Sequence, residues 1–122
     1  MNKAVFLDRD GTLNKEGKFV LKKEDIIILP KVLEALKNLK QKGYDLIVVT
    51  NQSAVARGLI NEEDLKEIHN FMNTKLNNLI DGFYYCPHHP KIFEDVPEYA
   101  KKYRIECDCR KPSPGMIFRA AQ

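Results

Sequence analysis

Two carboxylates lie at the end of the first apolar segment of this sequence. Asp8 and Asp10 follow residues 4–7 directly, with Arg9 between them. Two like charges this close repel each other unless a cation or a shared proton relieves them. The pair permits two interpretations: a turn capped by carboxylates, or a magnesium-assisted site in which one carboxylate is ligand and nucleophile and the other is a proton donor. The spacing alone favours neither.

A second group of residues suited to metal binding lies nearer the other end of the chain. Cys86-x-His88 and Cys107-x-Cys109 together supply three thiolates and an imidazole, a set suited to tetrahedral Zn²⁺. His89 is a rival imidazole. The commoner role of cysteines is that of small buried apolar side chains. A disulfide is disfavoured, because the C-x-C spacing is too tight for an easy bridge.

An alternation of strands and helices must position both groups. Short β-rich apolar runs predict strands, and apolar residues three or four positions apart predict helices. We expect strands at residues 4–7, 45–53 and 82–87, with helices beginning near residues 30, 61 and 113. The first strand reads as buried on both faces. The order predicts a Rossmann-like, doubly wound parallel α/β sheet, in which the polar segments that end the strands share the ligand-binding edge.

Specific residues mark where these helices begin and end. Gly43 follows the first helical stripe as a stop signal, and Asn61 can cap the second helix with Asp64 in its first turn. Ser113 reads as a cap with Pro114 at the first helical position. These signals agree with the strand pattern and add no second domain or linker. The sequence therefore predicts one domain over residues 1–122.

Composition narrows the classes of function. The 122 residues carry a formal charge of +3, which suits an anionic small molecule but is far below that of a dedicated nucleic-acid binder. No apolar run reaches the length of about 20 residues that a membrane helix needs. The first apolar run is broken by charges, so no signal peptide is expected. We therefore expect a cytoplasmic protein with no membrane or nucleic-acid partner.

Three segments carry a resemblance to a known family. The strings FLDRDGTLN, VVTNQS and CRKPSPGM, in this order, resemble the first three motifs of the haloacid dehalogenase (HAD) superfamily of phosphohydrolases. The segments TNQSAVARG, CPHHP and CDCRKPSPGM are most similar to the branch that contains the D-glycero-D-manno-heptose 1,7-bisphosphate phosphatases and the histidinol-phosphate phosphatase domain. The resemblance covers most of the chain.

The resemblance implies a role for each motif residue. Asp8 corresponds to the nucleophile, and Asp10 to the general acid and base, whose backbone carbonyl also binds the catalytic Mg²⁺ together with Asp8. Thr50, with the Asn51 backbone, and Lys111 would stabilise the phosphoryl group. The implied structural Zn²⁺ is bound by Cys86, His88, Cys107 and Cys109.

The implied zinc site would fix the loop at residues 87–109, so that Arg110 and Lys111 reach the phosphate edge. The stretch at residues 16–19 departs from the His-Gly-Tyr-like sequence that the heptose enzymes tend to carry. His69, beside the helical core stripe, is assigned a structural role. We expect substrate contacts from Arg9, Glu16, Gly17, Lys18, Phe19, Asn51, Gln52, Ser53, Arg57 and Arg110.

The acidic fourth motif of the superfamily does not follow the third motif before residue 122. We therefore expect the C-terminal strands to be lacking, and the chain as written to be poorly active. The expected function is a Mg²⁺-dependent phosphomonoesterase on a small phosphorylated metabolite, with heptose 1,7-bisphosphate first and histidinol phosphate or another sugar phosphate as alternatives. A 3′-phosphatase on nucleic-acid ends is disfavoured by the modest charge. A non-catalytic, zinc-stabilised fragment is the alternative from another class. The full-length protein is expected to be a monomer.

Overall fold

A three-stranded parallel sheet forms the centre of the protein. The computed structural model describes residues 3–90 and 96–121, and its strands are hydrogen-bonded in the order β1-β2-β3. Both strand pairs are parallel, as the alternation of strands and helices predicts. The strands are β1 (Lys3–Leu7), β2 (Tyr44–Asn51) and β3 (Gly82–Cys86).

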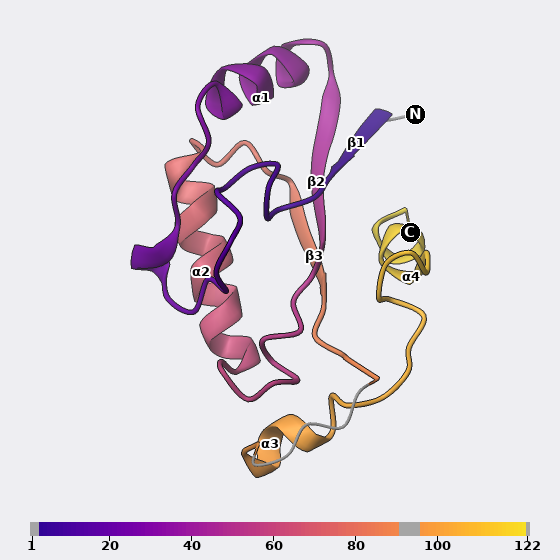
Figure 1. The fold of residues 1–122 in the computed structure, drawn as a ribbon. Coiled ribbons are helices and arrows are strands. Elements are labelled where there is room, and N and C mark those ends of the chain that lie inside the picture. The colour runs from indigo at the N-terminus through magenta and orange to yellow at the C-terminus, as the bar shows by residue number, and fades with distance from the viewer. Residues whose placement is uncertain (1–2, 91–95, 122) are drawn as a thin grey trace.

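Helices cover both faces of this sheet. Figure 1 shows α1 and α2 on one side of the strands and α4 on the other, with α3 beyond the carboxyl ends of the strands. No helix among residues 3–90 and 96–121 has the length and apolar character needed to cross a membrane. The helical elements are a short 3₁₀ turn, η1 (Lys23–Asp25), and four α-helices: α1 (Val32–Gln41), α2 (Glu62–Lys75), α3 (Glu98–Lys101) and α4 (Gly115–Ala120).

The alternation of side chains along β2 divides the core into two clusters. Leu46 and Val48 are fully buried on the side of α1 and α2, within the larger cluster. Val49 points to the opposite face and packs with Cys86 and Met116 in a smaller cluster beneath α4. Because successive strand residues point to opposite faces, a central strand covered on both sides needs apolar residues at consecutive positions.

The prediction that the first strand is buried on both faces is wrong. Val5 and Leu7 of β1 are half-buried against the larger cluster, whereas Phe6 between them is 38% exposed. The physical reason is the placement of α4, which contacts β2 and β3, whereas β1 is the edge strand on the other side of β2. The continuous apolar run therefore predicted the strand correctly, but it did not predict that one face of the strand is left uncovered.

Two of the three helix-boundary signals are confirmed. Gly43 follows α1 with a φ of 88°, and Asn61 forms a capping box with Asp64 at the start of α2. The predicted Ser113 cap is wrong, because α4 begins one residue later and Pro114 occupies the cap position without a side-chain hydrogen bond. Residues 91–95 of the loop that zinc was expected to fix lie outside the described residues.

Candidate active site and metal centre

Asp8 lies directly beyond β1 and faces a lysine from a distant part of the chain. Its Oδ2 is 3.0 Å from Nζ of Lys111, and its Oδ1 accepts a hydrogen bond from the backbone N–H of Arg9 at 2.8 Å. The Asp8 side chain is 48% exposed, so the carboxylate is open to a ligand. Nζ of Lys111 also donates to the carbonyl of Val49 at 3.2 Å. The predicted nucleophile and the predicted phosphoryl-binding cation are thus brought together.

Asn51 holds the segment that carries this lysine. Its Oδ1 accepts from the backbone N–H of Lys111 at 2.9 Å, and its Nδ2 donates to the carbonyl of Lys111 at 3.4 Å. A side-chain amide that pairs with both backbone groups of one residue fixes that residue in position. The Asn51 side chain therefore aligns the second and third motifs, beyond the substrate contact expected of it.

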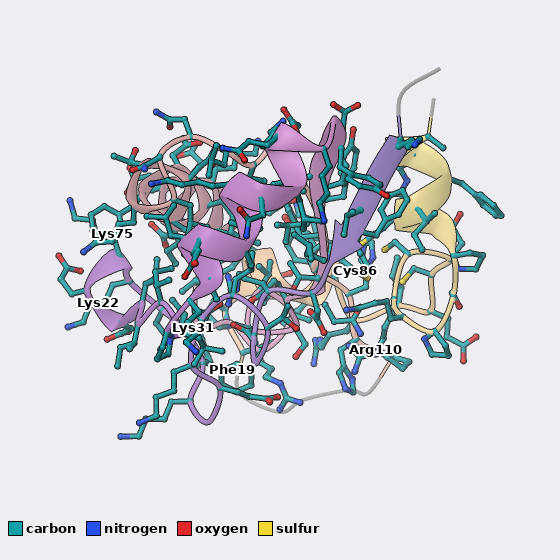
Figure 2. All side chains as sticks on the ribbon, turned by 90° about the horizontal axis from the view of Figure 1, so that it is seen from above. Phe19, Lys22, Lys31, Lys75, Cys86 and Arg110 are labelled. Atoms are coloured by element: carbon teal, nitrogen blue, oxygen red, sulfur yellow. The ribbon has the colours of Figure 1, made fainter. Side chains whose placement is uncertain are left out.

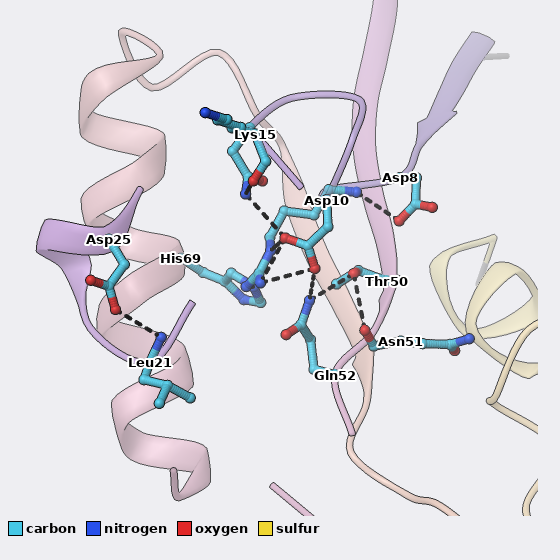
Figure 3. A network of polar contacts seen from close by, with 11 residues as sticks. Asp8, Asp10, Lys15, Leu21, Asp25, Thr50, Asn51, Gln52 and His69 are labelled. Carbon is cyan, nitrogen blue, oxygen red and sulfur yellow. Dashed lines mark hydrogen bonds and ion pairs between the residues drawn. The ribbon is translucent and has the colours of Figure 1, made fainter. Parts of the chain in front are cut away.

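Asp10 is surrounded by hydrogen-bond donors. Its Oδ1 accepts from Nε of Arg9 and from Nδ2 of Asn14, both at 3.0 Å. Its Oδ2 accepts from Nη2 of Arg9 at 3.1 Å and from Nε2 of Gln52 at 3.0 Å (Figure 3). Donors from three side chains hold the carboxylate in one orientation. The role of Asn14 was missed in the sequence, since nothing in its spacing distinguishes it from a turn residue.

Arg9 was expected to contact substrate, but the structure places it in the interior. The side chain is 1% exposed, and its guanidinium binds Asp10 on one side and Nε2 of His69 on the other, at 3.2 Å. Burial lowers the pKa of Arg9, an effect that the negative charge of Asp10 opposes. From this position Arg9 orients Asp10 and presents no surface to a ligand.

Thr50 is also enclosed. It is 1% exposed, and its Oγ1 accepts from Nε2 of Gln52 at 2.9 Å while lying 3.5 Å from the carbonyl of Asn51. Gln52 is 4% exposed and bridges Thr50 to Asp10 (Figure 3). Gln52 therefore contacts the carboxylate directly and Thr50 contacts it through Gln52. The predicted roles of Thr50 in phosphoryl binding and of Gln52 in substrate binding stay predictions.

The predicted substrate segment lines a hollow beside Asp10. Asp10 and residues 16–19 form its wall. The backbone turns into it at Gly11, whose φ is 83° and where an added Cβ would lie 2.7 Å from Oε2 of Glu16, so only glycine fits without strain. The expected contacts Glu16, Gly17, Lys18 and Phe19 are thus gathered at one surface.

Two further expected contacts join this surface from the loop after β2. The guanidinium of Arg57 lies 5.4 Å from the ring centroid of Phe19, and its Nε donates to Oγ of Ser53 at 3.3 Å. Arg110 instead lies beside His88, with its Nη1 3.5 Å from the carbonyl of that residue. Figure 2 labels Phe19 and Arg110, and shows Lys22 and Lys75 projecting outward from the ribbon.

The four predicted metal ligands converge. Donor atoms of Cys86, His88, Cys107 and Cys109 all lie within 4.8 Å of one another, and the three cysteines form no disulfide. His88 contributes Nδ1, which is 3.2 Å from Sγ of Cys109 and 3.6 Å from Sγ of Cys86. Sγ of Cys107 lies 3.4 Å from Sγ of Cys86 and 3.4 Å from Sγ of Cys109. We call this group the Cys/His cluster; the rival His89 is not one of its donors.

The geometry of the Cys/His cluster fits a tetrahedral metal ion. A Zn–S distance of about 2.3 Å places the ligand atoms of a tetrahedron about 3.7 Å apart. The contacts at 3.2 to 3.6 Å are close to this value, and the 2.7 Å between the sulfur atoms of Cys86 and Cys109 is shorter. Burial, together with the Cys109 hydrogen bond, raises the pKa of Cys86. Three thiolates in contact need a cation, because their mutual repulsion is otherwise relieved only by protonation. All four ligand positions are filled by protein, as in structural zinc sites.

Comparison with known proteins agrees with this geometry. Residues 3–122 match the profile of the family described as polynucleotide kinase 3 phosphatase. The chain belongs to this family. The chain is 44% identical over 120 residues to the D-glycero-beta-D-manno-heptose-1,7-bisphosphate 7-phosphatase of Photorhabdus laumondii, covering 96% of the chain and 61% of that protein. This family member thus spans about three fifths of the length of that curated relative.

Two solved structures share its fold. One is the D,D-heptose 1,7-bisphosphate phosphatase of B. bronchiseptica in complex with magnesium and phosphate, with a TM-score of 0.79 and 36% identity over 98% of the chain and 62% of that structure. The other is a HAD-like phosphatase of Mesorhizobium loti, with a TM-score of 0.82 and 29% identity over 98% of the chain and 56% of that structure. The resemblance to HAD-type heptose bisphosphate phosphatases is confirmed.

Proposed function

We propose that this family member provides the catalytic edge of a Mg²⁺-dependent phosphomonoesterase that removes the 7-phosphate of D-glycero-D-manno-heptose 1,7-bisphosphate. The observation that carries the proposal is the half-exposed Asp8 carboxylate, 3.0 Å from the Lys111 ammonium at the carboxyl edge of the sheet. Ligands of open α/β sheets bind at this edge. The similarity to named heptose bisphosphatases supports the choice of substrate.

Asp8 acts as the nucleophile. One of its oxygens attacks phosphorus in line, a P–O bond to Asp8 forms, and the P–O bond to the sugar breaks to leave an aspartyl-phosphate. Lys111 offsets the negative charge of the phosphoryl oxygens as the two anions approach. Asn51 serves this step indirectly, because its two hydrogen bonds fix the backbone of Lys111.

Asp10 moves the protons. In its acid form it protonates the departing sugar oxygen, and as a carboxylate it then takes a proton from the water that attacks the aspartyl-phosphate. The donors from Arg9, Asn14 and Gln52 hold the carboxylate form in place for the second step. Inorganic phosphate and the free Asp8 carboxylate are released.

The residues present fit a hard divalent cation at this edge. The exposed Asp8 carboxylate and the backbone carbonyl of Asp10 would hold Mg²⁺, which prefers oxygen ligands and keeps several waters. When bound, the ion neutralises charge between Asp8 and the phosphate. The Cys/His cluster would hold a structural Zn²⁺ and keep Arg110 and Lys111 at the phosphate edge.

Substrate selection is assigned to the hollow beside Asp10. Residues 16–19 and Arg57 line or border it, and the cations Lys18 and Arg57 can bind a second phosphate. The proposed whole protein is a cytoplasmic monomer whose partner is a phosphorylated sugar. A 3′-phosphatase acting on nucleic-acid ends is the second candidate, favoured by the description of the matching family.

A direct comparison of substrates tests the proposal. Phosphate release by the whole protein is measured on heptose 1,7-bisphosphate, histidinol phosphate and a 3′-phosphorylated oligonucleotide, each with and without Mg²⁺. We expect the heptose bisphosphate to give the highest kcat/KM, and only with Mg²⁺. A preference for the oligonucleotide would select the second candidate. Absence of hydrolysis from all three would overturn the phosphatase assignment.

A further inference from the structure

A buried histidine lies behind the Arg9–Asp10 pair. His69 on α2 is 3% exposed, and its ring stacks on Phe83 with centroids 4.6 Å apart and an interplanar angle of 13°. Its Nε2 is 3.2 Å from Nη1 of Arg9 (Figure 3). Stacking fixes the plane of the imidazole, so its nitrogen is presented to the arginine in one orientation.

The chemistry of arginine determines the state of this imidazole. A guanidinium has five N–H donors and no acceptor, so a hydrogen bond to it requires an unprotonated Nε2. The ring of His69 is therefore neutral, with its proton on Nδ1. Burial, together with the positive charge of Arg9, lowers the pKa of His69 to about 3, an effect that Asp10 opposes. The same neutral state follows from the hydrogen bond and from burial.

All three guanidinium nitrogens of Arg9 are engaged. Nε and Nη2 donate to the two oxygens of Asp10 at 3.0 and 3.1 Å, and Nη1 donates to His69. Arg9 is 1% exposed, and an apolar side chain in place of the imidazole would leave Nη1 without this acceptor. A buried charged donor without a partner is costly, so the guanidinium would turn to find one. Such a turn would move the carboxylate that the same guanidinium holds.

We propose that His69 is a positioning residue for Asp10, acting through Arg9 to aim the carboxyl group at the leaving oxygen of the substrate. This inference rests on the proposed function, since it assumes that Asp10 is the general acid. His69 does not touch the substrate. Its role is to keep the Arg9 fork, and with it Asp10, in the orientation that proton transfer requires.

The dependence of the rate on the leaving group tests this role. The whole protein is assayed as wild type, His69→Leu, His69→Gln and Phe83→Leu, on a sugar phosphate and on p-nitrophenyl phosphate. The aryl leaving group needs little protonation, so misplacement of a general acid lowers the rate of aryl phosphate hydrolysis less. We expect His69→Leu to lower kcat on the sugar phosphate about tenfold more than on the aryl phosphate. This is only part of the roughly 10²- to 10⁴-fold that a general acid contributes to a rate, because the acid is misplaced and not removed.

The other two variants separate positioning from packing. Oε1 of glutamine can replace Nε2 as acceptor, so His69→Gln should restore the leaving-group dependence of the wild type. Phe83→Leu removes the stacking ring but keeps the acceptor, so it should change the leaving-group dependence less than His69→Leu does. Equal losses on both substrates in His69→Leu, or no rescue by His69→Gln, would overturn the inference.

A measurement independent of activity checks the hydrogen bond itself. Two-bond ¹H–¹⁵N correlation spectra of ¹⁵N-histidine-labelled protein at neutral pH should show His69 protonated on Nδ1 alone. A proton on Nε2 would overturn the inference whatever the kinetics show. A whole protein without Mg²⁺-dependent hydrolysis would instead overturn the proposed function and the catalytic part of this inference, and the spectrum would still report the contact with Arg9.

Discussion

The carboxylate edge at Asp8, Asp10 and Lys111 and the Cys/His cluster are built in opposite ways. The Asp8 side chain is 48% exposed and faces one cation, whereas Cys86 and Cys109 are buried and contact other donors of the same cluster. The edge offers hard oxygen atoms and leaves room for a ligand. The cluster offers soft sulfur and nitrogen atoms and fills every position of a tetrahedron.

The comparison shows how solvent exposure differs between a site that admits a substrate and a site that only stabilises a loop. In a site that admits a substrate, the protein cannot fill every hydrogen-bonding position of the reacting group, so Asp8 remains accessible. Its neighbour Asp10 is held by the side-chain amides of Asn14 and Gln52 and by the guanidinium of Arg9. A metal site that only stabilises a loop is more stable when it is buried, because each ligand is then held by the metal ion and by the other ligands. The two sites should therefore respond differently to the loss of one donor.

The largest expected effect is on the open site. Asp8→Asn keeps the shape of the side chain and its hydrogen bond to the Arg9 backbone but removes the nucleophile, so kcat of the whole protein should fall by more than about 10⁴-fold. The thermal melt followed by circular dichroism should change little, since the lost ion pair with Lys111 is partly exposed. A variant that keeps near wild-type turnover would show that Asp8 is not the nucleophile.

Loss of one donor from the Cys/His cluster should have the opposite effect, lowering stability more than kcat. Cys109→Ser replaces a buried donor of the Cys/His cluster. We expect the wild type to carry about one zinc ion per chain, and the variant to lack it and to be less stable to urea. Zinc content is measured by atomic emission in protein purified without chelator. Asp108→Asn is the matched control, because the carboxylate of this neighbour is exposed and forms its ion pair with Arg119, outside the cluster. Metal-free wild-type protein, or zinc retained in Cys109→Ser, would contradict the assignment of the cluster.

A smaller effect should appear in the pH dependence of stability. The pKa of His69 is lowered to about 3 in the folded protein, by burial first and then by Arg9, with Asp10 opposing. An unfolded histidine titrates near pH 6.5, so between about pH 6.5 and 3 the unfolded state binds a proton that the folded state does not. Stability contributed by His69 is present above pH 6.5 and is lost as pH falls, by up to about 1.4 kcal/mol per pH unit.

Urea unfolding at several pH values measures this slope. The wild type should lose stability more steeply below about pH 6 than His69→Gln, which has no titrating group at this position. Parallel stability curves for the two proteins would mean that His69 binds its proton as readily in the folded protein as in the unfolded chain. That result would contradict a hydrogen bond from Arg9 to an unprotonated Nε2 below about pH 6.

The smallest effect should come from a residue that belongs to neither site. Asn61 caps α2, the helix that carries His69, through a hydrogen bond from the Asp64 backbone at 2.8 Å. Asn61→Ala should lower the free energy of unfolding by about 1 kcal/mol. The exposed Asn70 of the same helix gives the control, since Asn70→Ala should stay within about 0.5 kcal/mol of wild type. Neither should change kcat, and a loss of activity in Asn61→Ala would show that the helix start is coupled to the edge.

Much of the fold follows from the sequence alone. Apolar periodicity predicted three strands and the two long helices, and Asn61 and Gly43 marked helix ends, because these signals depend only on residues a few positions apart. The grouping of Asp8 with Lys111 and of the four members of the Cys/His cluster was predictable for a related reason. Strand ends, motif spacing and ligand types are local properties of the chain, and parallel strands bring their carboxyl ends to one edge.

The tertiary structure alone decided which of these groups face each other. Arg9 and Thr50 are both buried and contact Asp10, Arg9 directly and Thr50 through Gln52, because the packing of α2 and the loop after β2 closes over them. Asn51 pairs with Lys111 across 60 positions of sequence, and His88 enters the cluster where His89 does not. Each of these outcomes depends on which way a side chain points after distant segments pack, and a shift of one residue reverses that direction in an extended chain.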